Sequence, residues 1–242
     1  MHPLHGEGVR AILLDIEGTT TPAKFVSDVL FPYARARAGD FLARHGEEPA
    51  VREDLARLRE EHAADEHAGS SPPPWLDTLD SAIGYVQFLM DRDRKSTGLK
   101  SLQGRIWEEG YRSGALQGEV FPDVPTAFER WRRQGRGIAI FSSGSVLAQK
   151  LLFASTPAGD LTPCIRAYFD TTAGPKQKAQ SYHRIARALD FESREVLFLS
   201  DVVAELDAAR QAGMGTALCV RSGEAVAAPT HAVVYTFDGV CP

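Results

Sequence analysis

The sequence has few cysteines and no excess of positive charge. Its 242 residues include 3 cysteines, which lie far apart and form neither a disulfide framework nor a zinc-ligand spacing. Lysine and arginine number 27 against 32 aspartates and glutamates, a net charge of −5, so no basic field is available to hold a nucleic-acid backbone. We therefore expect a protein of a reducing cytoplasm with no nucleic-acid partner.

Long hydrophobic runs are also missing. No stretch approaches the roughly 20 apolar residues of a membrane span, and the opening MHPLHGEGVR lacks the apolar core of a signal peptide. We therefore expect a protein of the cytoplasm with no membrane partner. Because the sequence also lacks a heptad run, we expect a monomer. The residues that are present, 43% hydrophobic and 24% charged, are those of an ordinary globular protein.

Short apolar runs alternate with amphipathic helical stretches in the C-terminal half of the chain. The runs GIAIFSS, AYFD, EVLFLSD and GTALCV are typical of buried strands, and one more such run covers residues 9–16. Between them, residues 23–116 show only helical spacing. The pattern predicts an α/β protein with a doubly wound parallel sheet, built from residues 1–22 and 117–242 and carrying an inserted all-helical cap domain, 23–116.

Polar residues follow the apolar runs at the positions where a doubly wound sheet binds ligands. The residues concerned are Asp15, Glu17, Ser142, Ser143, Gly144 and Asp201, together with Lys176 and Lys178, which we expect to begin the helix before the EVLFLSD run. Taken alone, each has an ordinary structural alternative: an acid or a serine can cap a helix, and a lysine in a first turn can be solvated. Together, carboxylates, hydroxyls and an ammonium at one sheet edge favour phosphoryl transfer.

Two of the acids suit the attack on phosphorus. A carboxylate such as Asp15 can form an acyl phosphate, but a cation has to offset the charge of the phosphate dianion that it approaches. Asp15 and Asp201 offer the hard oxygen ligands that magnesium prefers. Glu17, two residues beyond Asp15, could protonate the leaving oxygen and later deprotonate the hydrolytic water.

The other polar groups suit the phosphate oxygens. The Ser142 hydroxyl, the backbone N–H groups of Ser143 and Gly144, and the Lys176 ammonium could bind them. Lys178 lies only two positions from Lys176, and a helix would turn the two side chains in different directions, so we expect only one of them to take this role.

The motifs DIEGTTTP, FSSGS, GPK and FLSDVVAELDAA, in this order, resemble the four motifs of the haloacid dehalogenase phosphatase superfamily. The blocks DRKSTGLKSLQGRIWEEGY and VFPDVPTAFERW further resemble its bifunctional enolase-phosphatases. The likeness is weakest at residues 47–74 and after 221. It implies one Mg²⁺ per subunit, held at Asp15, Glu17 and Asp201, with Asp15, Glu17 and Lys176 as catalytic residues.

The same resemblance implies a substrate and a pathway. The substrate is a small phosphorylated diketone, 2,3-diketo-5-methylthiopentyl 1-phosphate. It is enolised and then dephosphorylated to an acireductone in methionine salvage.

The insertion follows the first strand, where a lid could exclude water and contact the rest of the substrate. Lys100 is the candidate for such a contact, with Gln103 and Trp107 on a similar helical face; the alternative for Trp107 is packing within the helices. Glu17 is the first choice for the enolisation base. Glu205 could support the metal indirectly or could be an ordinary acid on a helix surface.

Three alternative functions stay open at this point. A phosphatase without enolase activity would use the same site. A receiver-type signalling module also gathers acids, a hydroxyl and a lysine. Such a module is compact, its phosphorylated acid lies on a later strand than the first, and its lysine comes after that acid in the chain. A metal-free dehalogenase of the same fold would have little use for Glu17 and Asp201.

Overall fold

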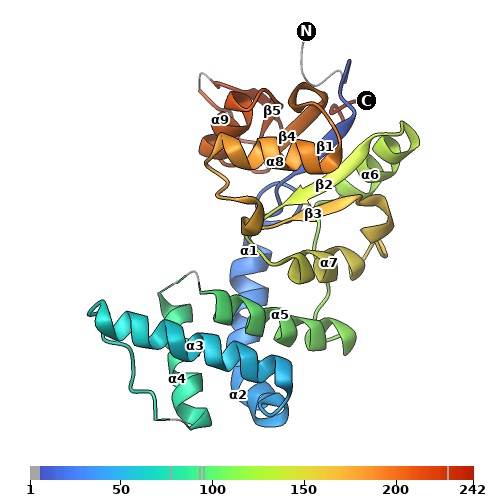
Figure 1. The fold of residues 1–242 in the computed structure, drawn as a ribbon. Helices are drawn as coiled ribbons and strands as arrows, with labels where there is room; N and C mark the ends of the chain where they lie inside the picture. The colour runs from blue at the N-terminus through green and yellow to red at the C-terminus, as the bar shows by residue number, and fades with distance from the viewer. Residues whose placement is uncertain (1–5, 77, 93, 95, 228) are drawn as a thin grey trace. The chain divides into compact units, whose positions relative to one another are not determined.

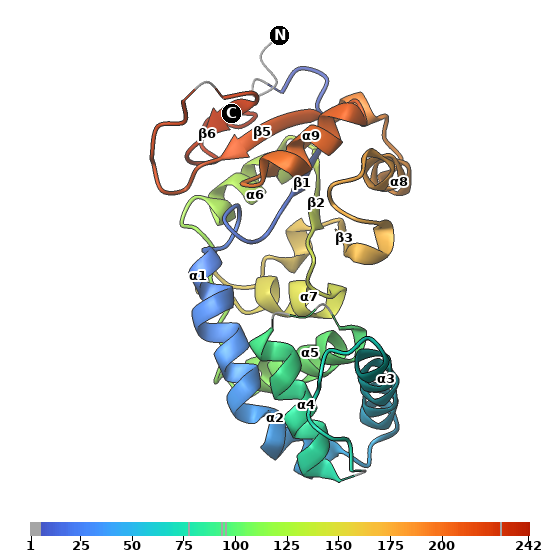
Figure 2. The same cartoon turned by 90° about the vertical axis from the view of Figure 1, so that its left-hand side faces the viewer.

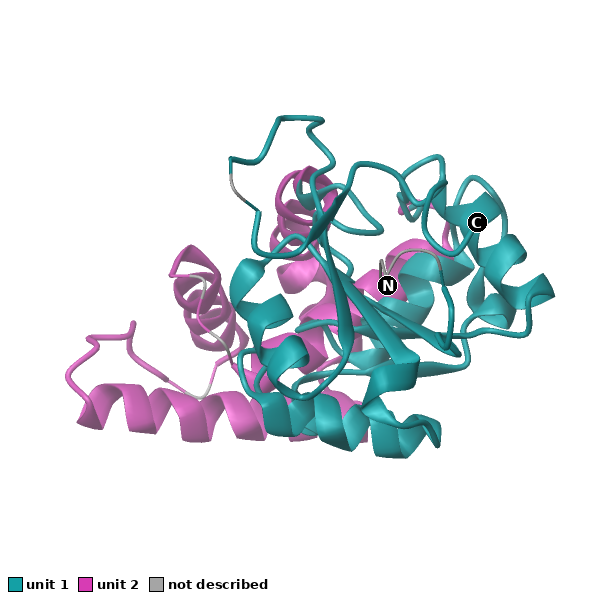
Figure 3. Cartoon of the chain, turned by 90° about the horizontal axis from the view of Figure 1, so that it is seen from above, with its two compact units in different colours: residues 1–23, 117–242 teal, residues 24–116 magenta. Residues whose placement is uncertain are grey.

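The computed structural model describes residues 6–76, 78–92, 94, 96–227 and 229–242. Residues 1–5 and 228 of the predicted core and residues 77, 93 and 95 of the predicted insertion lie outside these ranges. The chain forms two compact units (Figure 3): unit 1 comprises residues 1–23 and 117–242, and unit 2 comprises residues 24–116. No helix in the described ranges is long and apolar enough to cross a membrane.

Unit 1 is built on a parallel sheet of six strands (Figure 1). The strands are β1 (Ala11–Leu14), β2 (Gly137–Phe141), β3 (Ala167–Phe169), β4 (Val196–Ser200), β5 (Gly215–Cys219) and β6 (Ala232–Val234). Their order across the sheet is β3-β2-β1-β4-β5-β6, and every neighbouring pair is parallel. The predicted parallel α/β fold is therefore confirmed, and β6 is a strand that the apolar runs did not predict.

Helices cover both faces of this sheet (Figure 2). They are α6 (Val124–Arg133), α7 (Val146–Ala154), α8 (Ala179–Leu189) and α9 (Val203–Gln211), with short 3₁₀ turns at Thr162–Cys164, Thr171–Ala173 and Ser193–Glu195. The chain moves from β1 through β2 to β3, then returns to β4 and β5 on the other side of β1. Because parallel crossovers are right-handed, α6 and α7 lie on one face and α8 and α9 on the other.

Alternate residues of the strands supply the two halves of the core. Leu13 and Phe141 are completely buried and pack with Tyr182 and Ile185 of α8 and Leu206 of α9. The strands are apolar on both faces because both faces are covered, which is why they are written as continuous apolar runs in the sequence.

Unit 2 contains only helices among its described elements. They are α1 (Ala23–Phe25), the π-helical turn η2 (Val26–Leu30), α2 (Phe31–His45), α3 (Pro49–His67), α4 (Leu79–Asp91) and α5 (Thr97–Arg112). The start of α5 is capped by Ser96, whose hydroxyl accepts a bond from Leu99 N at 2.9 Å. Helices α3 and α5 approach closely at Gly98, where a Cβ would lie 2.8 Å from Leu58. An ion pair between the half-buried Arg105 and the buried Asp54, at 2.8 Å, joins the same two helices.

Candidate active site

The candidate site lies at the carboxyl ends of the three central strands of unit 1. Asp15 follows β1, Ser142 follows β2 and Asp201 follows β4. Since β1 pairs with both β2 and β4, these three residues emerge side by side. The sheet pairing continues one residue beyond β1, because Asp15 N donates to Leu199 O at 3.0 Å.

Asp15 is buried and its carboxylate is held by several donors. Its Oδ1 accepts from the backbone N–H of Ile16 at 2.7 Å and from Lys176 Nζ at 2.7 Å. Its Oδ2 accepts a longer bond from the Ser200 hydroxyl, 3.4 Å. Oδ1 thus holds the carboxylate in place, while Oδ2 has one weak partner among the described residues.

Lys176 is a buried cation between two carboxylates. Its ammonium lies 2.7 Å from Asp15 Oδ1 and 2.6 Å from Glu205 Oε2, and its side chain is only 9% exposed. Burial alone would lower the pKa of Lys176, but the two carboxylates outweigh burial and raise it. The ammonium therefore stays charged at neutral pH.

The structure also separates the two candidate lysines. Lys178 is exposed and lies just before α8, whereas Lys176 is buried against Asp15. The expectation that both lysines begin the helix is wrong, because α8 begins at Ala179 and both precede it. Lys176 instead sits in the turn after Gly174, and its carbonyl accepts a bond from the Tyr182 hydroxyl at 2.8 Å.

Glu205 and Ser200 complete the buried cluster. The Ser200 hydroxyl lies 3.1 Å from Glu205 Oε2 and 3.4 Å from Asp15 Oδ2, so it bridges the two acids. Burial and the charge of Asp15 raise the pKa of Glu205, and Lys176 offsets part of that rise. Glu205 is thus a direct partner of the lysine rather than an ordinary surface acid. Ser200 was not predicted; its one signal in the sequence is a hydroxyl at the end of an apolar strand.

Asp201 is exposed as a residue, but its carboxyl group packs against the backbone of Gly18. Gly18 has a φ of +65°, and a Cβ there would overlap Asp201 Oδ2. Partial burial and the negative charge of Asp15 raise the pKa of Asp201 to about 6. The negative charges of the two acids after β1 and β4 therefore repel each other.

Asp15 and Asp201 fit a divalent cation. Both offer carboxylate oxygens, and the charge of Asp15, which adds to the larger effect of burial in raising the pKa of Asp201, is one that a cation would offset. Within the described ranges, however, no three His, Cys, Asp or Glu side chains are gathered as a metal site. Glu17 is exposed, so the three predicted ligands Asp15, Glu17 and Asp201 do not form a ready-made cluster.

The loop after β2 has the form of an anion-binding loop. Ser142 is buried and its hydroxyl accepts from Gly144 N at 3.2 Å, while Ser143 is exposed. Ser145 caps α7 by accepting from Ala148 N at 3.2 Å. The start of α7 thus places N–H groups and hydroxyls next to the end of β2.

Gln149, which was not predicted, holds this loop in place. Its amide donates to Gly144 O and to Phe169 O, both at 2.9 Å. It thereby fixes the loop after β2 to the end of β3. Nothing in the sequence distinguishes it from any other helical glutamine.

The predicted contact residues of the insertion belong to unit 2. Lys100 is half-buried in the first turn of α5, and Gln103 is buried. Trp107 is buried too, donates from Nε1 to Leu30 O at 2.8 Å and packs against Phe31. For Trp107 the alternative interpretation, packing between helices, is therefore confirmed.

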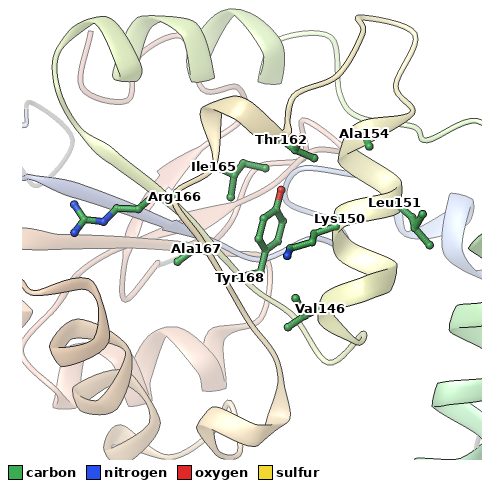
Figure 4. A pocket seen from close by; sticks show the side chains of 9 residues that line it. All are labelled: Val146, Lys150, Leu151, Ala154, Thr162, Ile165, Arg166, Ala167 and Tyr168. Atoms are coloured by element: carbon green, nitrogen blue, oxygen red, sulfur yellow. The ribbon is translucent and has the colours of Figure 1, made fainter. Parts of the chain in front are cut away.

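A cavity of about 650 Å³ lies elsewhere in unit 1, along α7 and the outer edge of β3 (Figure 4). Its lining residues are Val146, Lys150, Leu151, Ala154, Thr162, Ile165, Arg166, Ala167 and Tyr168. None of the candidate site residues described above lines it.

The fold and the cluster at the strand ends define a class of hydrolase. Residues 9–213 match the haloacid dehalogenase-like hydrolases. The chain belongs to this family and, within it, to the enolase-phosphatases. It is 52% identical to Enolase-phosphatase E1 of Synechococcus elongatus over 232 residues, which cover 95% of this chain and 97% of that protein. Enolase-phosphatase E1 of Pseudomonas syringae pv. tomato is 45% identical, with 94% and 96% covered.

A solved structure shows the same fold over nearly the whole chain. The UTR4 protein of Saccharomyces cerevisiae superposes with a TM-score of 0.79 at 33% identity and covers 95% of this chain and 99% of its own. The resemblance stated from the motifs is thus confirmed, and the protein is an enzyme, a phosphatase of this family.

Proposed function

We propose that this protein is a bifunctional, magnesium-dependent enolase-phosphatase that converts 2,3-diketo-5-methylthiopentyl 1-phosphate into an acireductone and phosphate, in the cytoplasm and as a monomer. The observation that carries the proposal is the buried Asp15 carboxylate held at 2.7 Å from the Lys176 ammonium at the end of β1. Near-full-length similarity to proteins named Enolase-phosphatase E1 supports the choice of substrate.

Asp15 is the nucleophile in this proposal. Its Oδ1 is engaged by Ile16 N and Lys176, so we expect Oδ2, with its single long bond, to attack phosphorus. The P–O bond to the substrate carbon skeleton breaks as the new P–O bond to Asp15 forms. Water then attacks the aspartyl phosphate and releases inorganic phosphate, which restores the carboxylate.

Glu17 moves the protons and the remaining groups hold the phosphate. The Glu17 carboxyl gives its proton to the leaving oxygen and takes one back from the hydrolytic water. Ser142, Ser143 and Gly144 bind the transferring oxygens together with Lys176, whose charge compensates the developing negative charge.

The preceding enolisation removes a proton from C1, and Glu17 is the base that we propose for it. Mg²⁺ held by Asp15 and Asp201 would polarise the carbonyl and offset the charge of the phosphate. Glu17 lies two residues beyond Asp15, so the same loop would serve both steps.

The test is to supply the diketone phosphate and record enediol absorbance and phosphate release together. We expect an enol signal followed by stoichiometric phosphate, and we expect both to stop when Mg²⁺ is chelated. Phosphate without any enol signal would reduce the function to that of a plain phosphatase. Enolisation that continues in chelator would show that the protein's own groups suffice for that step.

The variant Asp15→Asn tests the nucleophile in the same assay. An amide cannot form the acyl phosphate, so phosphate release should fall by more than about a thousandfold, or ~4 kcal/mol in the barrier. Asp238→Asn, which changes an exposed carboxyl of the same unit, is the control and should leave turnover intact. If Asp15→Asn kept its rate within about tenfold of the wild type, Asp15 would not be the nucleophile.

A further inference from the structure

Arg221, two residues beyond β5, is a buried cation that contacts three separate segments of unit 1. Its Nε donates to Thr19 O at 2.9 Å, and its side chain is only 8% exposed. One terminal nitrogen lies 2.8 Å from Asp123 Oδ2 and 3.3 Å from Tyr235 O. The guanidinium lies over the ring of Phe237 at 4.2 Å from its centroid.

The geometry of these contacts requires arginine. A buried charge is costly unless it is paired and hydrogen-bonded; Arg221 is paired with Asp123 and bonds through Nε and one terminal nitrogen, while its other terminal nitrogen is buried without a partner among the described residues. Its planar fork bonds a carbonyl with one edge and the Asp123 carboxylate with another, while its face lies over an aromatic ring. Lysine carries the same charge on a single nitrogen and cannot make both bonds in this arrangement.

The carbonyl that Arg221 holds belongs to the turn that follows Asp15. In this turn the N–H groups of Thr20 and Thr21 both donate to Ile16 O at 2.9 Å, and the Thr20 hydroxyl donates to Asp15 O at 3.1 Å. These bonds fix the path of the backbone directly after Asp15.

The segment at residues 121–123 bonds to this turn and also contacts Arg221. Phe121 N donates to Thr20 O at 2.9 Å, and the Phe121 ring lies 4.4 Å from the Arg221 guanidinium. Arg221 therefore holds both segments: it bonds to Thr19 in the turn, and it contacts Phe121 and Asp123 in the segment that bonds to the turn.

We propose that Arg221 is a positioning residue that fixes the turn at residues 16–21, and with it Asp15, through Thr19 O. It touches neither the proposed nucleophile nor the phosphate-binding loop in this structure. The expected effect of Arg221 on kcat rests on the proposed function. Its effect on the turn can be measured by hydrogen exchange without any substrate.

Arg130 provides a matched control. It also ties the C-terminal segment down, because it donates to Phe237 O at 2.6 Å and to Val240 O at 3.1 Å. It differs from Arg221 in having no bond to the turn that follows Asp15 in these contacts. Loss of either arginine should loosen the C-terminal segment, but only loss of Arg221 should loosen the turn.

The experiment compares Arg221→Met, Arg221→Lys and Arg130→Met in the full chain by hydrogen exchange and by steady-state kinetics. We expect Arg221→Met to speed exchange in the peptide 15–22 by about tenfold or more and to lower kcat by a similar factor with KM within about threefold. Arg221→Lys should recover thermal stability more than it recovers slow exchange. Arg130→Met should lose stability while keeping wild-type exchange in this peptide and wild-type kcat.

Equal exchange in the peptide 15–22 for Arg221→Met and Arg130→Met would overturn the inference, as would a fall in kcat of the same size in both. A wild-type enzyme that failed to turn over the diketone phosphate would instead contradict the proposed function. In that case the exchange comparison would still decide the role of Arg221.

Discussion

Lys176 is the residue on which the electrostatics of the site depend. It lies between Asp15 and Glu205, so Lys176→Met would leave two buried carboxylates with no cation between them. We expect this variant to lose about 3 kcal/mol of folding free energy in urea unfolding without Mg²⁺. Lys178→Met, which changes an exposed side chain, should stay within about 0.5 kcal/mol of the wild type.

The same variant should show a defined pH dependence. Burial and the charge of Asp15 already raise the pKa of Glu205 in the wild type, and loss of Lys176 removes the group that offsets the rise. A carboxyl whose folded pKa lies above its unfolded pKa destabilises the fold once it is deprotonated. The deficit of Lys176→Met should therefore be full above the folded pKa and shrink as the pH falls through it; a deficit that does not change with pH would contradict this account.

The sequence predicted the charged members of this site but not the groups that hold them. Asp15 and Lys176 stand out because an acid after an apolar run and a lysine after a glycine and a proline are visible in one dimension. Ser200 and Arg221 act through contacts between residues more than 180 positions apart, such as Ser200 to Asp15 and Arg221 to Thr19. Those contacts depend on the sheet order, in which β1, β4 and β5 are consecutive, and no single segment of the sequence shows that order.

At the scale of the structural element, the turn after β1 explains why Gly18 occupies its position. Gly18→Ala would combine a positive φ of +65° with an overlap between its new Cβ and the Asp201 carboxyl. Gly8→Ala is the matched control, because Gly8 has a φ of +77° and nothing within 4 Å of its Cβ position. We expect about 1 kcal/mol of lost stability for Gly8→Ala from backbone strain alone, and about 1–3 kcal/mol more for Gly18→Ala.

Activity separates the two glycine variants further. In Gly18→Ala the Asp201 carboxyl has to move, so phosphate release should fall at subsaturating Mg²⁺ and recover in part as Mg²⁺ is raised. Gly8→Ala should keep the wild-type Mg²⁺ dependence. If the two variants lost equal stability and kept equal activity, the close approach of Gly18 to Asp201 would contribute neither to stability nor to activity.

The buried strands of the sheet were predictable from the sequence, whereas its edge strand β6 and the beginning of α8 were not. The five apolar runs became β1 to β5 because parallel strands covered on both faces need apolar residues at every position. Strand β6 (Ala232–Val234) escaped prediction because it is only three residues long and half-buried at the edge of the sheet. The beginning of α8 was misplaced because residues after Gly174 turn before they become helical.

At the scale of the whole molecule, the insertion interrupts unit 1 next to the turn that carries the site. Unit 1 breaks off after residue 23 and resumes at residue 117. Phe121, shortly after that return, bonds to Thr20 at 2.9 Å. The chain thus leaves and re-enters unit 1 within a few residues of the turn after Asp15. That attachment is the reason to expect residues 24–116 to act on the substrate rather than on stability alone.

Lys100 tests that expectation. If its ammonium contacts the keto oxygen, Lys100→Ala should lower kcat/KM for the diketone phosphate by about tenfold or more, and for a small generic phosphate ester by less than about threefold, whereas a contact with the phosphate alone should lower both values. The control is Arg112→Ala on the same helix, which removes an exposed cation paired with Glu108 at 2.7 Å and should change neither value. Equal losses on both substrates would show that Lys100 does not contact the keto oxygen. Specificity would then have to come from the strand ends of unit 1, because the generic ester shares only the phosphate with the diketone.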